Sequence, residues 1–318
     1  MADQKSEHPG GLTREHVVWA YRLMLDREPE SEDVIGPKLD GSRDTGELRR
    51  HLMTSAEFQG KNRDYAHSND RTIVIKELEG GVRLFVDLSD HVIGLNIVRG
   101  QYEVDEVRYV RTVLRPGDTA IDAGAHIGFF TMQMAAMVGR EGRVHAFEPL
   151  EANAELLERS IKENQFADRI DFRRAAVGAA SGTATLTFPV ETLNTGGAYL
   201  LHEGTAALPG NQKKSVPVVA LDDLRIRRPL RLIKMDVEGA EPLVISGAEA
   251  LLRSDRPVVL SELHPTQLAR ASGTSADAFL SSLRSIGYQA RAIERGQVGA
   301  PLDRAPAGAL VSIVLLPM

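Results

Sequence analysis

The chain has 318 residues, a hydrophobic fraction of 42% and a formal net charge of −6. This composition predicts a soluble globular protein with one large domain plus an appendage, or two domains, and its acidic balance argues against nucleic-acid binding. The absence of cysteine excludes disulfides, thiolate nucleophiles and cysteine-ligated zinc, which fits a cytoplasmic location. We expect neither a transmembrane segment nor a signal peptide, because no apolar run approaches the roughly 18 residues of a membrane span.

Residues 1–66 are predicted to form a small helical module. The segment TREHVVWAYRLMLDREP begins with Thr13 as a helix N-cap and ends at Pro29. Its apolar residues recur along one helical face: Val17, Ala20, Tyr21, Met24 and Leu25. A second helix is expected through DTGELRRHLMTSAEF.

Residues 67–102 are predicted to form a hairpin and linker region. Apolar residues alternate on both sides of Gly80 and Gly81, which indicates a β-hairpin that leads into further extended chain.

Residues 103–318 repeat a strand and then a helix. The expected strands are DTAIDAG, RVHAFEP, IDFRRAAVG, LRLIKMDVEG, PVVLSELHP, YQARAIE and ALVSIVLL. This alternation predicts an α/β fold with a mostly parallel seven-stranded sheet flanked by helices. In such sheets, ligands bind beyond the carboxyl ends of the strands, near the switch in strand order.

A glycine turn follows the first of these strands. Asp122 precedes Gly124 and Gly128, and His126 stands where a dinucleotide fingerprint would place its middle glycine. A carboxylate at this point suits a ligand with a cationic amino group, and the glycines would let the backbone approach that ligand closely. S-adenosylmethionine has the required ammonium group.

The second strand ends in HAFEP and places Glu148 about two dozen residues after the turn. A carboxylate at this position accepts hydrogen bonds from ribose hydroxyls in S-adenosylmethionine and nicotinamide enzymes alike. The order of the turn, Glu148 and RRAAVG favours S-adenosylmethionine.

The fourth and fifth strands end in groups that can carry chemistry. LIKMDVEGAE delivers Asp236 and Glu238, and VVLSELHP brings Glu262 and His264 to the adjacent strand end. We expect His264 to act as the general base, with Asp236 and Glu238 orienting a hydroxyl. If Mg²⁺ or Mn²⁺ is bound, Asp236, Glu262 and His264 are its expected ligands.

From about Gln101 to His264, the chain resembles FkbM-type S-adenosylmethionine-dependent methyltransferases. The resemblance rests on YE, DAGAHIGFFT, FEP, AAVG, IKMDVEGAE and ELHP. It implies a Rossmann-like domain that methylates hydroxyl oxygens, often on sugars, glycolipids, polysaccharides or polyketides. The residues that it implies for the cofactor are Glu103, Asp122, Gly124, Glu148 and Ala176, with Ala125, His126 and Gly128 completing the turn. It leaves metal dependence open.

The N-terminal module is similar to a small helical domain found with bacterial glycan-modifying enzymes, through YRLMLDREP and SAEF. This association with glycan-modifying enzymes favours a glycan or glycolipid acceptor. The alternative is that the module serves only for packing or homo-oligomerisation. The stretch from Val190 to Lys214 lacks clear periodicity and is expected to be a loop that shapes the acceptor site. Asn194 and Tyr199 are its candidate ligand contacts.

The sequence therefore predicts an S-adenosylmethionine-dependent O-methyltransferase acting on a sugar or related hydroxyl acceptor. Two alternatives stay open. A nicotinamide-dependent oxidoreductase would share Glu148, and a non-catalytic adaptor would use the same fold as a scaffold.

Overall fold

The computed structural model describes residues 12–53, 55, 57–58, 72–90, 92–189, 195–202, 204–305 and 310–318. Contacts within the chain divide it into two units, Met1–Arg71 and Thr72–Met318. Among the described residues, no helix is both long enough and apolar enough to cross a membrane.

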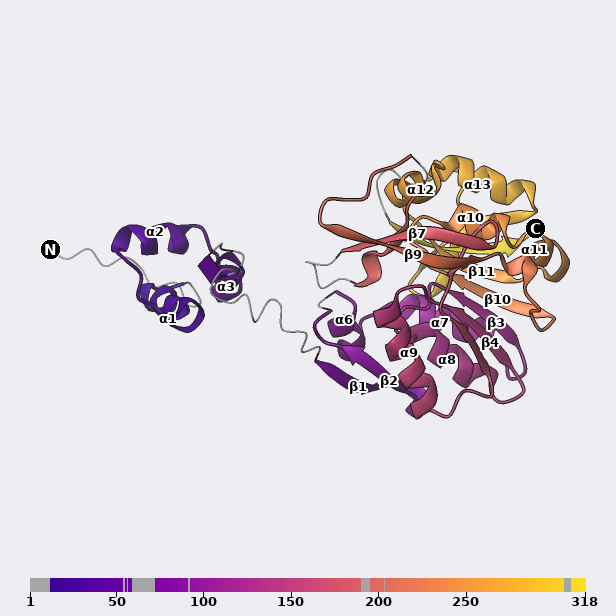
Figure 1. The fold of residues 1–318 in the computed structure, drawn as a ribbon, viewed down its shortest axis with the longest axis horizontal. Coiled ribbons are helices and arrows are strands. Elements are labelled where there is room, and N and C mark those ends of the chain that lie inside the picture. The colour runs from indigo at the N-terminus through magenta and orange to yellow at the C-terminus, as the bar shows by residue number, and fades with distance from the viewer. Residues whose placement is uncertain are drawn as a thin grey trace. The chain divides into compact units, whose positions relative to one another are not determined.

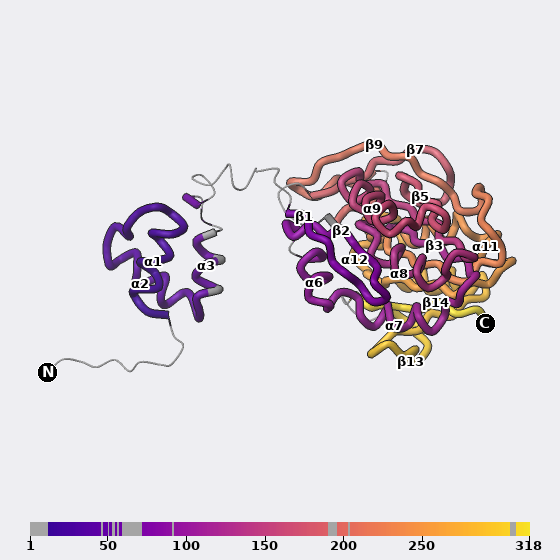
Figure 2. Tube along the Cα trace, turned by 90° about the horizontal axis from the view of Figure 1, so that it is seen from below, coloured from indigo at the N-terminus to yellow at the C-terminus, as the bar shows by residue number. Residues whose placement is uncertain are grey.

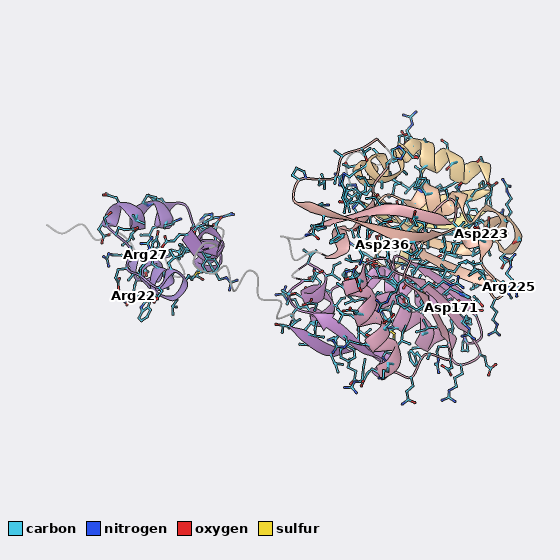
Figure 3. All side chains as sticks on the ribbon, in the orientation of Figure 1. Arg22, Arg27, Asp171, Asp223, Arg225 and Asp236 are labelled. Carbon is cyan, nitrogen blue, oxygen red and sulfur yellow. The ribbon has the colours of Figure 1, made fainter. Side chains whose placement is uncertain are left out.

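The first unit contains α1 (Arg14–Leu25), α2 (Glu32–Asp40) and α3 (Thr45–Met53). Thr13 caps α1 as expected, because its side chain accepts a hydrogen bond from the backbone N–H of His16. The apolar face of α1 packs against α2 and α3 and includes Val17, Tyr21 and Leu25. The helix α2 was not expected, since only Ile35 of its residues is buried and its apolar pattern is correspondingly faint. Figure 3 shows the side chains of this unit, including Arg22 and Arg27.

The second unit begins with the expected hairpin, formed by β1 (Ile73–Glu77) and β2 (Arg83–Asp87) around the turn η1 (Glu79–Gly81). The hairpin packs on α9 (Glu151–Glu163), where the backbone N–H of Phe85 donates to the hydroxyl of Ser160 at 3.0 Å (Figures 1 and 2).

The expectation of extended chain after the hairpin is wrong. Gly94–Arg99 forms the helix α6, and Val104–Val113 forms α7. Only two residues of α6 are buried, so a pattern over so few residues does not distinguish helix from strand.

The described residues form an eight-stranded main sheet in the order β13-β12-β14-β11-β10-β3-β4-β5. Five neighbouring strands are parallel, and β14 runs antiparallel to β11 and β12. All seven expected strands contribute to this sheet: β3 (Thr119–Ala123), β4 (Arg143–Phe147), β5 (Ile170–Arg173), β10 (Leu230–Met235), β11 (Val258–Leu263), β12 (Tyr288–Glu294) and β14 (Val311–Pro317). The expected strand IDFRRAAVG is divided, because its first part forms β5 here and Ala176–Val177 belongs to another sheet. The eighth, β13 (Gln297–Pro301), is an edge strand paired only with β12 in the described part of the chain.

Helices cover both faces of this sheet (Figure 1). One apolar cluster joins α7, α8 (Phe129–Val138) and α9 to one face, and includes Ala120 and Leu232. The other cluster joins α10 (Glu241–Ser246), α11 (Glu249–Asp255), α12 (Pro265–Ser272) and α13 (Ala276–Ser285) to the opposite face, and includes Ile121 and Ile233. Adjacent residues of one strand thus face opposite helical layers.

A second, four-stranded sheet was not expected. Its order is β6-β9-β7-β8, with β6 (Ala176–Val177), β7 (Gly182–Pro189), β8 (Tyr199–Leu200) and β9 (Asn211–Val219). Two short 3₁₀ turns, η2 (Thr195–Gly197) and η3 (Leu221–Asp223), flank these strands. The predicted loop from 190 to 214 therefore contains β8 and the start of β9. The first half of β9 is exposed, so its residues show no apolar pattern that predicts a strand. Pairing with β7, rather than burial, stabilises it.

Candidate active site

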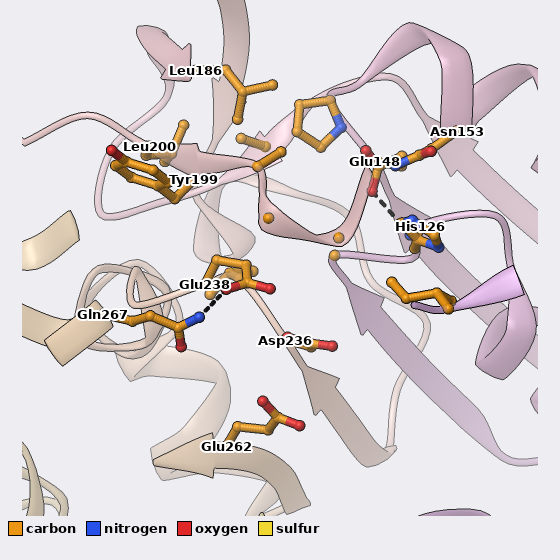
Figure 4. A pocket seen from close by; sticks show the side chains of 18 of the residues that line it. His126, Glu148, Asn153, Leu186, Tyr199, Leu200, Asp236, Glu238, Glu262 and Gln267 are labelled. Atoms are coloured by element: carbon orange, nitrogen blue, oxygen red, sulfur yellow. Dashed lines mark hydrogen bonds between the residues drawn. The ribbon is translucent and has the colours of Figure 1, made fainter. Parts of the chain in front are cut away.

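A cavity of about 390 Å³ lies at the carboxyl ends of the main-sheet strands (Figure 4). The strands β3 and β10 are neighbours there, and the order of the chain through the sheet reverses between them. Gly124, Glu148, Asp236 and Glu262 reach the cavity from the ends of four adjacent strands. The carboxyl edge at the switch point is therefore where the side chains converge.

The glycine turn after β3 is hydrogen-bonded to the end of the neighbouring strand β4. Gly124 has φ of +82°, and its backbone N–H donates to the carbonyl of Phe147 at 3.0 Å. A Cβ at Gly124 would lie 1.8 Å from the carbonyl oxygen of Asp236. A Cβ at Gly128 would lie 2.4 Å from Leu157. The expectation that both glycines make room for a ligand needs correction, because the missing side chains make room for protein.

The other turn residues differ in whether they line the cavity. His126 lines it with a positive φ of 51°, and burial lowers the pKa of its imidazole to about 4. Ala125 and Gly128 do not line it within the described residues.

Asp122 lies beneath the cavity and does not line it, contrary to the expected direct contact. Its side chain is fully buried, and its Oδ2 accepts a hydrogen bond from Thr131 at 2.5 Å. Burial raises the pKa of this carboxyl. Side chains of β3 alternate between the two faces of the sheet. Asp122 is still part of this strand, and its side chain points to the face that α8 covers.

Glu148 lines the cavity at the end of β4. One of its oxygens accepts from the backbone N–H of His126 at 2.9 Å and the other from that of Leu150 at 2.8 Å. Burial raises the pKa of Glu148 to about 7, and the hydrogen bonds from these N–H groups and from Asn153 oppose this rise. A carboxylate held by two backbone donors keeps lone pairs free for further donors.

The cavity also receives Tyr102 and Glu103 from the start of α7, and Ala176 from β6. Glu103 has a positive φ of 42° as the N-cap residue of α7. Burial raises its pKa to about 7.

Beyond the turn, Asp236 is paired with a buried lysine. The Nζ of Lys234 lies 3.0 Å from the Oδ2 of Asp236. Glu103, Asp236 and Glu262 each offer an oxygen, and these three atoms lie within 4.8 Å of one another. Burial and the charge of Asp236 raise the pKa of Glu262 to about 9.

Glu238 faces the cavity next to Gln267 (Figure 4). Gln267, from α12, donates its side-chain N–H to the carboxylate of Glu238. Glu238 has a positive φ of 54°, and burial raises its pKa to about 8. Glu241 is buried behind this segment and accepts from the backbone N–H groups of Val237 and Gly239, each at 3.3 Å.

His264 does not line the cavity, so its predicted role as general base is not supported. Its Nδ1 is buried and makes no hydrogen bond within the described chain. The physical reason is that the chain turns into α12 directly after β11, and His264 is the N-cap residue of that helix. The metal set with Asp236 and Glu262 changes for the same reason, because Glu103 takes the place expected for His264.

The second sheet covers the other side of the cavity with Leu186, Tyr199 and Leu200. Tyr199 is buried, and its hydroxyl accepts from the backbone N–H of Leu208 at 3.3 Å. Asn194, the other residue expected here, lies outside the described residues.

The predicted site residues did not include Lys234, Asn153 or Gln267. Lys234 lies within IKMDVEGAE and was read as part of a strand, although a lysine inside an apolar strand is a signal of a buried charge. Asn153 and Gln267 line the cavity from the first turns of α9 and α12. Only the fold brings these helix starts to the strand ends.

Comparison with known proteins agrees with this architecture. The family model of the methyltransferase FkbM domain matches residues 122–290. The 31-O-demethyl-FK506 methyltransferase FkbM of Streptomyces tacrolimicus is 32% identical over 162 residues, which are 43% of this chain and 61% of that protein. The chain thus matches about three fifths of this curated relative.

Two solved structures are also similar. Methyltransferase FkbM from Methylobacillus flagellatus KT is 17% identical, with a TM-score of 0.40 over 73% of this chain and 55% of that one. The TYW2 protein of M. jannaschii, in complex with AdoMet, is 13% identical, with a TM-score of 0.44 over 79% and 89%. Because the family model matches more than half of the chain, the protein belongs to the FkbM methyltransferase domain family, as the sequence motifs predicted.

Proposed function

We propose that this protein is an S-adenosylmethionine-dependent O-methyltransferase whose acceptor is a hydroxyl of a sugar, glycolipid, polysaccharide or related natural product. The observation that carries the proposal is the cavity of an FkbM-family chain, with a ribose-type carboxylate at Glu148 and a carboxylate at Asp236 across the switch point. Family membership also counts against the nicotinamide alternative.

The residues at the Glu148 end fit the cofactor. The carboxylate of Glu148 is fixed by two backbone donors and has lone pairs left for the two ribose hydroxyls. The methionine ammonium would meet Glu103, which lines the cavity, while Asp122 accepts a hydrogen bond from Thr131 of α8. Ala176 and the turn backbone at Gly124 complete this end. When bound, S-adenosylmethionine supplies an electrophilic methyl group on a cationic sulfur.

The other end of the cavity suits a hydroxyl acceptor. Glu238, Gln267 and Asp236 offer both hydrogen-bond acceptors and N–H donors, which a hydroxyl matches because it donates and accepts. No lysine or arginine lines the described cavity, so an anionic acceptor would lack a counter-ion. The curated relative is named a methyltransferase of 31-O-demethyl-FK506, a substrate described as lacking an O-methyl group, which supports oxygen as the accepting atom.

Asp236 is the proposed general base. Its carboxylate lines the cavity at the end of β10, and Lys234 holds it in place. It would accept the proton of the acceptor hydroxyl, while Glu238 and Gln267 orient the acceptor. Leu186, Tyr199 and Leu200 exclude water from this end, and positioning of donor and acceptor supplies much of the rate.

Isotopic methyl transfer tests the function. The purified protein is incubated with methyl-labelled S-adenosylmethionine and fractionated cell extract, and base-stable label in a hydroxyl-bearing product is expected. Calorimetry with S-adenosylhomocysteine and with NADH runs in parallel. Binding of NADH alone would favour the oxidoreductase. Binding of neither ligand, with no labelled product, would favour a non-catalytic adaptor.

A further inference from the structure

Lys234 is a buried cation on β10, next to Asp236 of the cavity lining. Only 5% of the residue is exposed, and its Nζ lies 4.8 Å from the centroid of the Phe130 ring and 3.0 Å from Asp236. A lysine is rarely buried to this degree unless carboxylates pair with it. The charge of Lys234 is therefore expected to balance the charge of nearby carboxylates.

Several carboxylates share that cation. Burial by itself would lower the pKa of Lys234, but the charges of Asp236, Glu103 and Asp122 raise it above its ordinary value. Lys234 thus stays charged while it joins groups from β10, β3 and the start of α7. Without it, these carboxylates would repel one another in a poorly solvated site.

Two of these carboxylates, Glu103 and Asp236, form with Glu262 a group that has the spacing of a divalent cation site. Oxygens of Glu103, Asp236 and Glu262 lie within 4.8 Å of one another, and hard divalent ions prefer oxygen ligands. Asp236 belongs both to this group and to the ion pair with Lys234. An ion bound by the three carboxylates would therefore sit beside an ammonium of the same sign, which repels it.

We propose that Lys234 is a positioning residue whose ammonium takes the charge-balancing place of a divalent cation, so that the site holds Glu103 and Asp236 together without a bound metal. The catalytic consequence, transfer that needs no Mg²⁺ or Mn²⁺, rests on the proposed function. The electrostatic consequence concerns the protein alone. Removing the ammonium should turn the carboxylate group into a metal site.

The test is Mn²⁺ binding by the cofactor-free protein, measured by calorimetry at one pH for wild type, Lys234→Met and Lys234→Arg. Wild type and Lys234→Arg should bind Mn²⁺ no more tightly than about 1 mM, in the range of weak carboxylate sites. Lys234→Met should bind at least about tenfold more tightly, because even in water a unit charge about 6 Å from a divalent ion changes its affinity by this factor. Lys213→Met, on the exposed part of β9, is the matched control and should resemble wild type.

Two results would overturn the proposal. One is a folded Lys234→Met protein that binds Mn²⁺ no better than wild type. The other is micromolar binding of Mn²⁺ by wild type, a measurement that stands even if Lys234→Met does not fold. Loss of methyl transfer by wild type after treatment with a chelator, restored by Mn²⁺, would contradict the catalytic consequence. Failure of wild type to bind S-adenosylhomocysteine would refute the proposed function and leave the Mn²⁺ comparison intact.

Discussion

Replacing Glu148 by glutamine should weaken S-adenosylhomocysteine binding in a pH-dependent way. The ionised carboxylate offers charge-assisted hydrogen bonds to ribose hydroxyls, and each such bond contributes about 1.5 to 3 kcal/mol. Glutamine keeps the shape but removes the charge. Its side-chain NH₂ group would also face one of the two backbone N–H donors that bond to Glu148 in the wild type. At pH 8.5 we expect the dissociation constant to rise by roughly ten- to a hundredfold.

The pH dependence follows from the raised pKa. Burial raises the pKa of Glu148 from 4.5 to about 7 in the cofactor-free protein, so wild type is ionised at pH 8.5 and mostly protonated at pH 6. If the cofactor needs the ionised form, wild-type affinity falls by about tenfold for each pH unit below 7. Glu148→Gln lacks this titration. The ratio of the two dissociation constants should therefore shrink towards unity at pH 6.

Calorimetric titrations at pH 6 and 8.5 provide the measurement. Glu155→Gln is the matched control, because this residue is exposed on α9, the helix that follows Glu148 in the chain. An affinity of Glu148→Gln within twofold of wild type at pH 8.5 would refute the placement of the ribose. A ratio that is the same at both pH values would refute the link to titration of Glu148.

Four further outcomes are expected. Gly124→Ala should lower the melting temperature far more than Gly117→Ala, because both residues have positive φ but only the first would drive a Cβ to 1.8 Å from a backbone oxygen; equal losses would mean that strain alone decides. Deletion of residues 1–71 should leave S-adenosylhomocysteine affinity within about twofold, since every proposed cofactor residue belongs to the second unit; a folded truncation that binds nothing would contradict this. In single-turnover assays, Asp236→Asn should slow methyl transfer by about 10²- to 10⁴-fold while His264→Ala stays near wild type, and the reverse order would restore the histidine as base. The free energy of unfolding of the cofactor-free protein should fall between about pH 4.5 and 7, because the folded state binds more protons than the unfolded state wherever buried glutamates have raised pKa values; chemical denaturation that shows rising stability over this range would contradict the sign.

Much of the main sheet is predictable because its signals are local. Most of the parallel strands are short apolar runs that end in a turn or a helix start, which the sequence marks with glycine, proline or an acidic residue. The chain order of strands and helices, together with the rule that ligands bind at the carboxyl ends, was enough to bring Gly124, Glu148 and Asp236 to one edge.

The second sheet had no such local signal. Its strand β8 has two residues and β9 exposes half of its length, so pairing with β7, across a connection that carries no clear periodicity, defines both. Pairing between segments far apart in the chain leaves little trace in a single window of sequence.

The sequence by itself determined which acids stand at the strand ends, because this follows from the β–α pattern and its two-residue period. Only the tertiary structure decided what each acid faces. Asp122 and Glu148 both belong to the predicted cofactor motifs, yet packing against α8 buries Asp122 and two backbone donors hold Glu148 in the cavity. Likewise, His264 lies at the start of α12 and outside the cavity lining, and the meeting of β10 with β3 and the start of α7 gives Lys234 its carboxylate partners. Burial and charge pairing depend on neighbours from other elements, and a chain read in order does not contain those neighbours.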